Sequence, residues 1–251
     1  MTTRNLPGSS DAARHGAGDA DLTIMLAAHA ALRRDTERLA RAAAFAELPD
    51  PARRASVRAG WELFKRQLHL HHTAEDAIVW PALRERLAHS DHARSVLDAM
   101  EYEHQQLDPL LAAVDAAFAR AWRDRAAGAH APGDVEAGGR PGGGAGGRSG
   151  RGASVADAAD ALTTALAGHL AHEERDGLPL IGVALSAAEW RGVGFRIVRK
   201  NGLSAGGEMF AWLAEGADPD HAAAAIGTLP PPARLVFRGL WKPRYDRTSR
   251  W

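Results

Sequence analysis

Two stretches of the chain place apolar side chains at alternating steps of three and four residues, the spacing that lines one face of an α-helix. The first stripe consists of Trp61, Phe64, Leu68, His71, Glu75 and Ile78. The second consists of Ala159, Leu162, Leu166, His169 and Glu173. A carboxylate in a protein core costs several kcal/mol unless it is neutralised or paired. Because both stripes change from apolar residues to a histidine and then a glutamate, they indicate a functional site.

Boundary signals predict four long helices. The first begins at Asp21, runs to about residue 45 and has one mainly apolar face, made of Leu22, Leu26, His29, Leu32 and Leu39. The second begins at Asp50, which is followed by a proline. We expect this helix to break or kink at Trp80 and Pro81.

The third helix opens at Ser90 and the fourth at Ser154, where Asp157 completes a capping box. The third has a continuous seam, made of Leu97, Met100, His104, Leu107, Leu111, Val114 and Phe118. Because this seam continues beyond Pro109, the proline predicts a kink rather than an end. The fourth helix is expected to end near Gly177, shortly before a further proline.

These elements predict an all-α fold, with a four-helix bundle over residues 21–185 and a helical C-terminal extension over 186–251. Residues 1–20 are polar and are predicted to form a disordered tail. Residues 126–153 contain Gly, Pro, Arg and Ala without periodicity, which predicts a flexible loop within the bundle.

The predicted extension is rich in aromatic residues and ends in a basic segment. Its aromatic residues include Trp190, Phe195, Phe210, Trp212, Phe237, Trp241 and Trp251. These side chains either pack on the bundle or form a lid or pocket over one of its ends. The basic residues between 234 and 250 offer a second interpretation, a surface that docks a partner or an acidic surface.

The second and fourth helices match each other when His71 is placed on His169. The glutamate four residues later and the proline ten residues later then coincide in both helices. The first and third helices match more weakly, through His29 and His104. A bundle with this pseudo-two-fold repeat would bring both sets of side chains to its centre, which is the arrangement of a dinuclear metal site.

Six side chains are therefore the candidate metal ligands: His29, His71, Glu75, His104, His169 and Glu173. A carboxylate can bridge two ions, and this set of six ligands leaves positions for a bridging oxygen and an exchangeable ligand. Imidazoles and carboxylates with open positions favour two non-haem iron ions over manganese or zinc.

Five further residues lie close enough to the two stripes to add to the site. His172 and Glu101 are candidates for a seventh ligand, and His72 belongs to the same supporting group. Asp76 and Glu174 are candidate acceptors for imidazole N–H groups. The remaining histidines are expected to face solvent or lie away from the site: His15, His69, His89, His92, His130 and His221.

Composition narrows the possible functions. The sequence contains no cysteine, which excludes disulfides, thiolate metal sites and cysteine nucleophiles, and suits a cytoplasmic protein. Its formal net charge is +0, so a nucleic-acid-binding surface is not expected. No secretory signal and no membrane span are predicted.

These residues together resemble the hemerythrin family, specifically bacterial hemerythrin-like (HHE cation-binding) domains. The resemblance covers about 22–185 and rests on four motifs in order: His29, His71-His72-x2-Glu75-Asp76 with Trp80-Pro81, Glu103-His104, and His169-x2-His172-Glu173-Glu174 with Pro179. It implies a four-helix bundle with an oxo- or hydroxo-bridged diiron centre that binds O2 or reacts with peroxide or NO.

The sequence also departs from related patterns. Oxygen-carrying hemerythrins have five histidines, two of them one turn apart on the third helix, whereas Met100 and Asp108 flank His104 here. This difference predicts a more open or differently ligated metal and argues against simple reversible O2 carriage. The absence of cysteine separates the chain from iron-centre repair proteins. The Glu-x-x-His spacing of ferritin-like oxidases occurs only at Glu101 and His104.

Three functions remain open at this point. The leading one is a diiron protein that binds, senses or reacts with O2 or a small oxidant such as peroxide or NO. The second is a diiron oxygenase, oxidase or peroxidase acting on an organic substrate, which would need an apolar pocket that reaches the metals. The third is an interaction module that uses the basic aromatic C-terminus.

Overall fold

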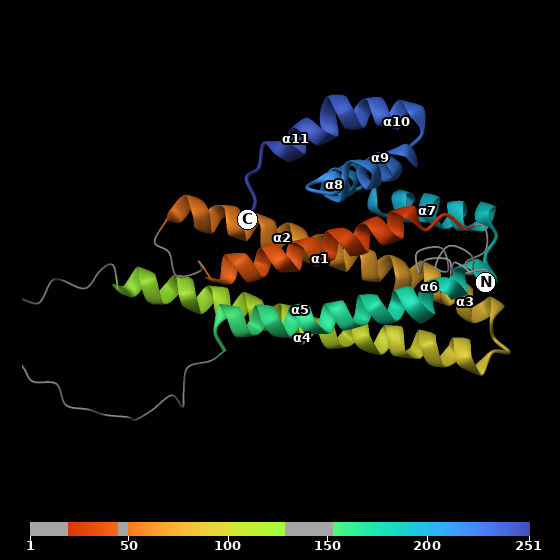
Figure 1. The fold of residues 1–251 in the computed structure, drawn as a ribbon, viewed down its shortest axis with the longest axis horizontal. Helices are drawn as coiled ribbons and strands as arrows, with labels where there is room; N and C mark the ends of the chain where they lie inside the picture. The colour runs from red at the N-terminus through yellow and green to blue at the C-terminus, as the bar shows by residue number, and fades with distance from the viewer. Residues whose placement is uncertain (1–19, 45–49, 129–152) are drawn as a thin grey trace, which may run out of the picture.

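The computed structural model describes residues 20–44, 50–128 and 153–251, and these ranges contain helices and no strands. Four long helices lie side by side (Figure 1): α1 Thr23–Ala44, α2 Pro51–Ala74, α4 Asp91–Gly128 and α5 Val155–His172. Two predictions fall mainly outside the described residues, namely the tail at 1–20 and the loop at 126–153. The all-α prediction is confirmed, and the chain forms a helical bundle.

Helix capping follows the sequence closely. The side chain of Asp50 accepts a hydrogen bond from the backbone of Ala52, and proline occupies the first turn of α2. Ser154 forms the predicted capping box at the start of α5. The helix α4 passes through Pro109 without ending, as predicted. Each cap satisfies backbone N–H groups that have no partner within the helix.

Two helix boundaries differ from the predictions. After α2 the chain forms a π-helical turn over Glu75–Val79 and continues as α3 Trp80–Arg86, so of the predicted break or kink at Trp80 and Pro81 the break is wrong. After α5 a second π-helical turn covers Glu173–Gly177 and leads into α6 Leu178–Ala184, so the predicted end near Gly177 is wrong.

The prolines explain why both helices continue. In each case proline is the second residue after the π-helical turn, and the wider turn accommodates a residue that has no N–H group to donate. The backbone N–H of Trp80 instead bonds to the carbonyl of Glu75, and that of Leu178 to Glu173, five residues earlier in each helix.

The bundle has two apolar clusters along its length. The larger cluster includes Leu32, Leu68, Leu107 and Leu166, and the smaller includes Met25, Val79, Trp80, Met100 and Ile181. In each long helix the predicted ligands lie between residues of the two clusters, so the polar site is enclosed from both ends. One stripe prediction is wrong: Leu26 on α1 is 48% exposed, although Leu32 and Leu39 are buried.

The C-terminal extension packs along the side of the bundle formed by α1 and α2 (Figure 1). Its elements are α7 Ala187–Asn201, α8 Leu203–Ala214, α9 Pro219–Gly227, α10 Pro231–Val236, a π-helical turn Phe237–Trp241, and α11 Lys242–Asp246. The Trp212 indole donates a 2.7 Å hydrogen bond to buried Asp35 on α1. Trp251 lies against Gly60 of α2.

Most aromatic residues of the extension thus pack on the bundle. Phe210, Trp212 and Phe237 are buried in the larger apolar cluster, whereas Phe195 is 73% exposed. None of the helices in the described ranges is long and apolar enough to cross a membrane.

Candidate metal centre

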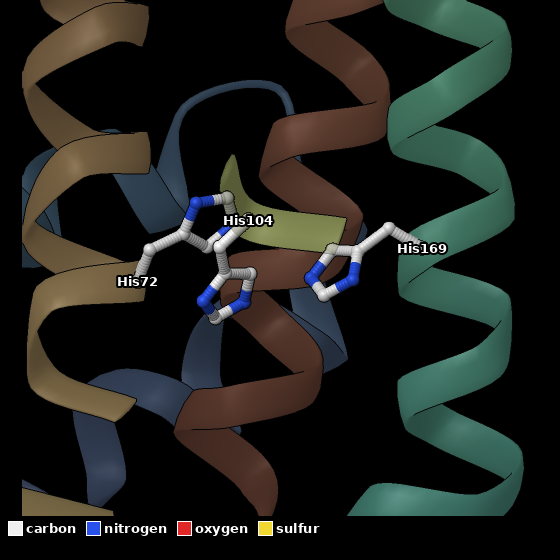
Figure 2. A group of neighbouring side chains, drawn as sticks. All are labelled: His72, His104 and His169. Carbon is white, nitrogen blue, oxygen red and sulfur yellow. The ribbon is translucent and has the colours of Figure 1, made fainter. Parts of the chain in front are cut away.

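The structure brings all six predicted ligands together and adds His72. Two groups form, in which the potential ligand atoms lie within 4.8 Å of one another: His29, His71, Glu75 and Glu173 in one, and His72, His104 and His169 in the other. Figure 2 shows the three histidines of the second group pointing toward one another from α2, α4 and α5. The rings of His72 and His104 stack with centroids 3.9 Å apart.

The two glutamates lie between the groups. One carboxylate oxygen of Glu75 is 3.2 Å from Nε2 of His71, and the other is 3.6 Å from Nε2 of His104. Oε2 of Glu173 lies 3.2 Å from Nε2 of His29 and 3.8 Å from Nε2 of His169. Each carboxylate therefore faces histidines of both groups, the position from which one carboxylate can bridge two cations.

The atoms that face this centre have no hydrogen-bond partner in the protein. They are Nε2 of all five histidines and both carboxylate oxygens of both glutamates: His29, His71, His72, His104, His169, Glu75 and Glu173. Both glutamates are almost completely buried, with exposures of 1% and 0%. Buried polar atoms without partners are costly, so their convergence indicates a bound cation.

A second layer of carboxylates holds the other nitrogen of three of these rings. Nδ1 of His29 lies 2.8 Å from Glu174, and Nδ1 of His104 lies 2.8 Å from Asp76. Nδ1 of His169 lies 2.9 Å from Glu103. Because a carboxylate accepts, Nδ1 carries the proton in each ring and the lone pair of Nε2 is directed at the centre.

The titratable side chains of the centre change one another's pKa values. Burial, together with the positive charge of His29, lowers the pKa of His71 to about 3. For His29, burial lowers the pKa, but the nearby carboxylate of Glu173 and the hydrogen-bonded carboxylate of Glu174 outweigh burial and raise the pKa to about 9. Burial and the nearby charge of Glu173 raise the pKa of Glu75. A cation would displace the proton from His29 and ionise Glu75, so its binding should release protons.

Comparison with known families explains this arrangement. The family model described as "Hemerythrin HHE cation binding domain" matches residues 20–181. The chain belongs to this hemerythrin family. No curated protein and no solved structure matches the chain.

Within this hemerythrin domain, the fifth histidine comes from α2. The prediction of a more open metal rested on Met100, which lies one turn before His104 and is buried as an apolar residue. His72 enters the second group instead, so that group contains three histidines. This third histidine is supplied by α2 and not by α4, where Met100 and Asp108 flank His104.

Two candidates for the seventh ligand lie outside the centre. Nδ1 of His172 is 2.7 Å from Glu103, and its Nε2 is 3.4 Å from Asp176. Glu101 is paired with Arg84 at the surface, at 3.0 Å. Both residues lie beside the seam in sequence, but their side chains point to the flank of the bundle.

Glu103 is the supporting residue that sequence reasoning missed. One of its oxygens holds His169 and the other holds His172, which ties α4 to α5. The signal that could have identified it was the Glu103-His104 motif, which was used only for the resemblance to the hemerythrin family. The prediction that Asp76 and Glu174 lie beside imidazole N–H groups agrees with the geometry.

Proposed function

We propose that this hemerythrin-family protein holds two non-haem iron ions and binds, senses or reacts with O2 or a related small oxidant such as peroxide or NO. The observation that supports the proposal most directly is the set of nine buried, unpartnered atoms contributed by five histidines and two glutamates. Nitrogen and carboxylate ligands with no thiolate favour iron in such a site. Paired iron ions supply the electrons for binding or reducing a small oxidant.

The two groups suggest how the ions are shared. His29 and His71 would hold one ion, and the other three histidines would hold the second, with Glu75 and Glu173 bridging them. The first ion then has fewer protein ligands and is the one with room for an exchangeable ligand. This division also fits the proposed pseudo-two-fold repeat, since a π-helical turn begins at the glutamate in each half.

The protein around the centre favours a small ligand over an organic substrate. Among the seven residues, His71 is about 10% exposed at its side chain, and the two glutamates are closed off by both apolar clusters. An apolar cavity of about 480 Å³ does exist between α1, α8 and α9, lined by residues such as Leu26, Ala30 and Leu213. None of the seven residues lines it, so this cavity does not support an oxygenase or oxidase that acts on an organic substrate.

The surrounding side chains have definite roles in this proposal. Asp76, Glu103 and Glu174 hold three imidazoles in one tautomer and orientation, which lowers the entropy lost when an ion binds. The apolar clusters limit the access of water to the centre, which would tune the redox potential of the bound metals.

Metal analysis combined with optical spectra of the reduced protein before and after exposure to air tests the proposal. We expect one iron per group and an oxo-to-iron absorption band that develops when air is admitted. Recovery of the initial spectrum on deoxygenation would support binding or sensing. Irreversible oxidation would instead favour an oxidase or peroxidase, and no stoichiometric metal after reconstitution would refute the diiron site.

Two variants locate the metals. Glu75→Ala and Glu173→Ala should each lose iron, because each removes a carboxylate that faces both groups. Glu101→Ala is a suitable control, since its side chain pairs with Arg84 at the surface. Full iron content in both glutamate variants would refute the assignment.

A further inference from the structure

The last helical stretch of the chain has apolar residues on two opposite faces. It runs without interruption through α10, the following π-helical turn and α11, from Pro231 to Asp246. Phe237 and Tyr245 are buried on the face toward the bundle, and Trp241 packs against Gly207 of α8. In Figure 1, α10 and α11 form the layer farthest from α4 and α5.

The outer face of this stretch has apolar side chains without a partner in the protein. Leu235 is 72% exposed, Val236 is 41% exposed and Leu240 is 58% exposed. The described residues contain nine exposed large apolar side chains, and six of them belong to the extension. The extension contains only about a third of the described residues, so the exposed apolar surface is concentrated there.

Cations lie beside these apolar side chains. Arg238, Arg244 and Arg247 are exposed and form no ion pair or side-chain hydrogen bond within the described ranges. Two neighbouring basic residues already have partners in the protein. Lys242 forms an ion pair with Asp246 at 2.6 Å, and Arg250 donates a hydrogen bond to the carbonyl of Tyr245. Only some of the cations are therefore free for an external partner.

The charge of the whole extension has the same sign. Residues 186–251 contain ten Lys and Arg against six Asp and Glu, a formal charge of +4. Since the complete chain has a formal charge of +0, the remainder has a charge of −4. The protein is thus divided into a basic extension and an acidic bundle.

We propose that the outer face of Pro231–Asp246, which we call the docking face, binds peripherally to the surface of a membrane that contains anionic phospholipids. Basic helices with exposed aliphatic residues lie in the interface, where the aliphatic side chains enter the acyl boundary and the cations meet the headgroups. This inference does not depend on the metals bound by the centre.

The other partners fit these residues less well. Two copies of the chain that met through their docking faces would bring Arg238 and Arg244 of one copy against the same cations of the other. A nucleic acid would pair with the cations but leave Leu235 and Leu240 without apolar contacts. An anionic lipid surface satisfies both kinds of side chain.

Vesicle sedimentation of the full chain tests the proposal. We expect binding to vesicles of phosphatidylcholine mixed with phosphatidylglycerol, weak binding to phosphatidylcholine alone, and a decrease as salt is raised. The double variant Arg238→Glu with Arg244→Glu should reduce the partition coefficient at least roughly tenfold. Its matched control is Arg41→Glu with Arg94→Glu, which makes the same charge change at exposed positions of the bundle.

A second pair of variants tests the apolar contribution. Leu235→Ser with Leu240→Ser should reduce partitioning roughly several-fold, whereas Tyr102→Ser with Val183→Ser, also exposed but on the bundle, should not. All four side chains are exposed, so the variants should fold normally. Equal loss in both pairs, or no vesicle binding, would overturn the proposal. Retained binding to heparin without vesicle binding would identify an acidic macromolecule instead and would equally overturn it.

Discussion

Glu103 links two histidines that differ in their position relative to the centre. One carboxylate oxygen holds His169, which faces the centre, and the other holds His172 at the flank. The carboxylate therefore fixes the orientation of a metal ligand without contacting the metal itself. Partners of this kind influence metal affinity through the basicity and orientation of the ligand.

Replacement of Glu103 should therefore weaken metal binding. We expect Glu103→Gln to reduce the affinity roughly 10- to 100-fold, because the amide holds the imidazole less strongly and offers an N–H donor to one ring. Competition with a coloured chelator measures the change. Glu101→Gln, on the same helix at the surface, should leave the affinity unchanged; a similar loss there would contradict the role of Glu103.

His72 provides a second test at the level of single residues. His72→Ala should reduce iron content by the ion of the three-histidine group, because only His104 and His169 remain in that group. Elemental analysis after reconstitution measures the loss. His69→Ala changes an exposed histidine of the same helix and should retain full metal content. Equal metal content in the two variants would show that His72 is not a ligand.

The side-chain period was sufficient to predict six of these residues but not the place of His72. His71 and His72 are adjacent, so they project about 100° apart on a helix, and the stripe selects only one of them. His72 reaches the centre because α4 and α5 present His104 and His169 on its side of α2. Such a contact between three helices depends on their packing, which a single helical period does not specify.

At the scale of the helices, the π-helical turn after α5 creates a close contact beside the centre. A Cβ atom at Gly177 would lie 3.2 Å from Cγ of Glu173 and 3.6 Å from Sδ of Met100. A side chain at this position would therefore crowd Glu173, which would have to shift by a few tenths of an ångström. The other π-helical turn has Val79 at the equivalent place, so the two glutamates have different neighbours.

Gly177→Ala should therefore lower metal affinity without unfolding the protein. The added methyl group would push Glu173, whose position is fixed when it binds a metal, while alanine itself favours the helix. Chelator competition and chemical denaturation measure the two effects separately. Gly168→Ala is the matched control in α5, where no atom lies within 4 Å of the added Cβ. It should raise the free energy of unfolding by roughly 0.5–1 kcal/mol and leave metal affinity unchanged.

Helix starts were predictable because caps are local, but both helix ends near the prolines were not. Asp50, Ser154 and Ser186 each hydrogen-bond to backbone groups within three residues, so short motifs specify them. At Trp80 and Leu178 the chain instead uses a wider turn that accommodates the following proline. The sequence rule that proline ends a helix does not include this possibility.

At the scale of the whole molecule, buried polar groups attach the extension to the bundle. Asp35 on α1 accepts hydrogen bonds from Trp212 and Arg34, and Glu215 accepts one from Tyr245 at 2.6 Å. Arg38 pairs with both carboxylates at 3.1 Å. Trp212 and Asp35 are more than 170 positions apart in the sequence, and no local motif indicates a contact between them.

This attachment should depend on pH through Glu215. Burial raises the pKa of Glu215, but the hydrogen bond from Tyr245 and the charge of Arg38 outweigh burial and hold the pKa below its ordinary value of 4.5. A lowered carboxyl pKa stabilises the folded state above the ordinary value, and this stabilisation is lost as the pH falls through the folded pKa.

Denaturation curves of the wild type and Glu215→Gln at a series of pH values test this expectation. The variant should be less stable near neutral pH, and the difference should shrink as the pH falls below about 4.5. A difference that stayed constant down to strongly acidic pH would show that the ionised carboxylate does not attach the extension.

The two π-helical turns of the bundle, Glu75–Val79 and Glu173–Gly177, also change the direction in which the side chains of their helices point. Each turn contains one residue more than an α-helical turn would need, so the side chains beyond it are displaced by about 100° from those before it. Beyond the first of these turns Val79 and Trp80 are buried in the second apolar cluster, and Ile78 packs against it while only partly buried. One continuous helix can thus contribute side chains to both apolar clusters, and a glutamate lies where the π-helical turn begins. Deleting a single residue such as Ala77 would leave a more regular helix, yet it would turn Trp80 and Leu83 away from the cluster that they now fill.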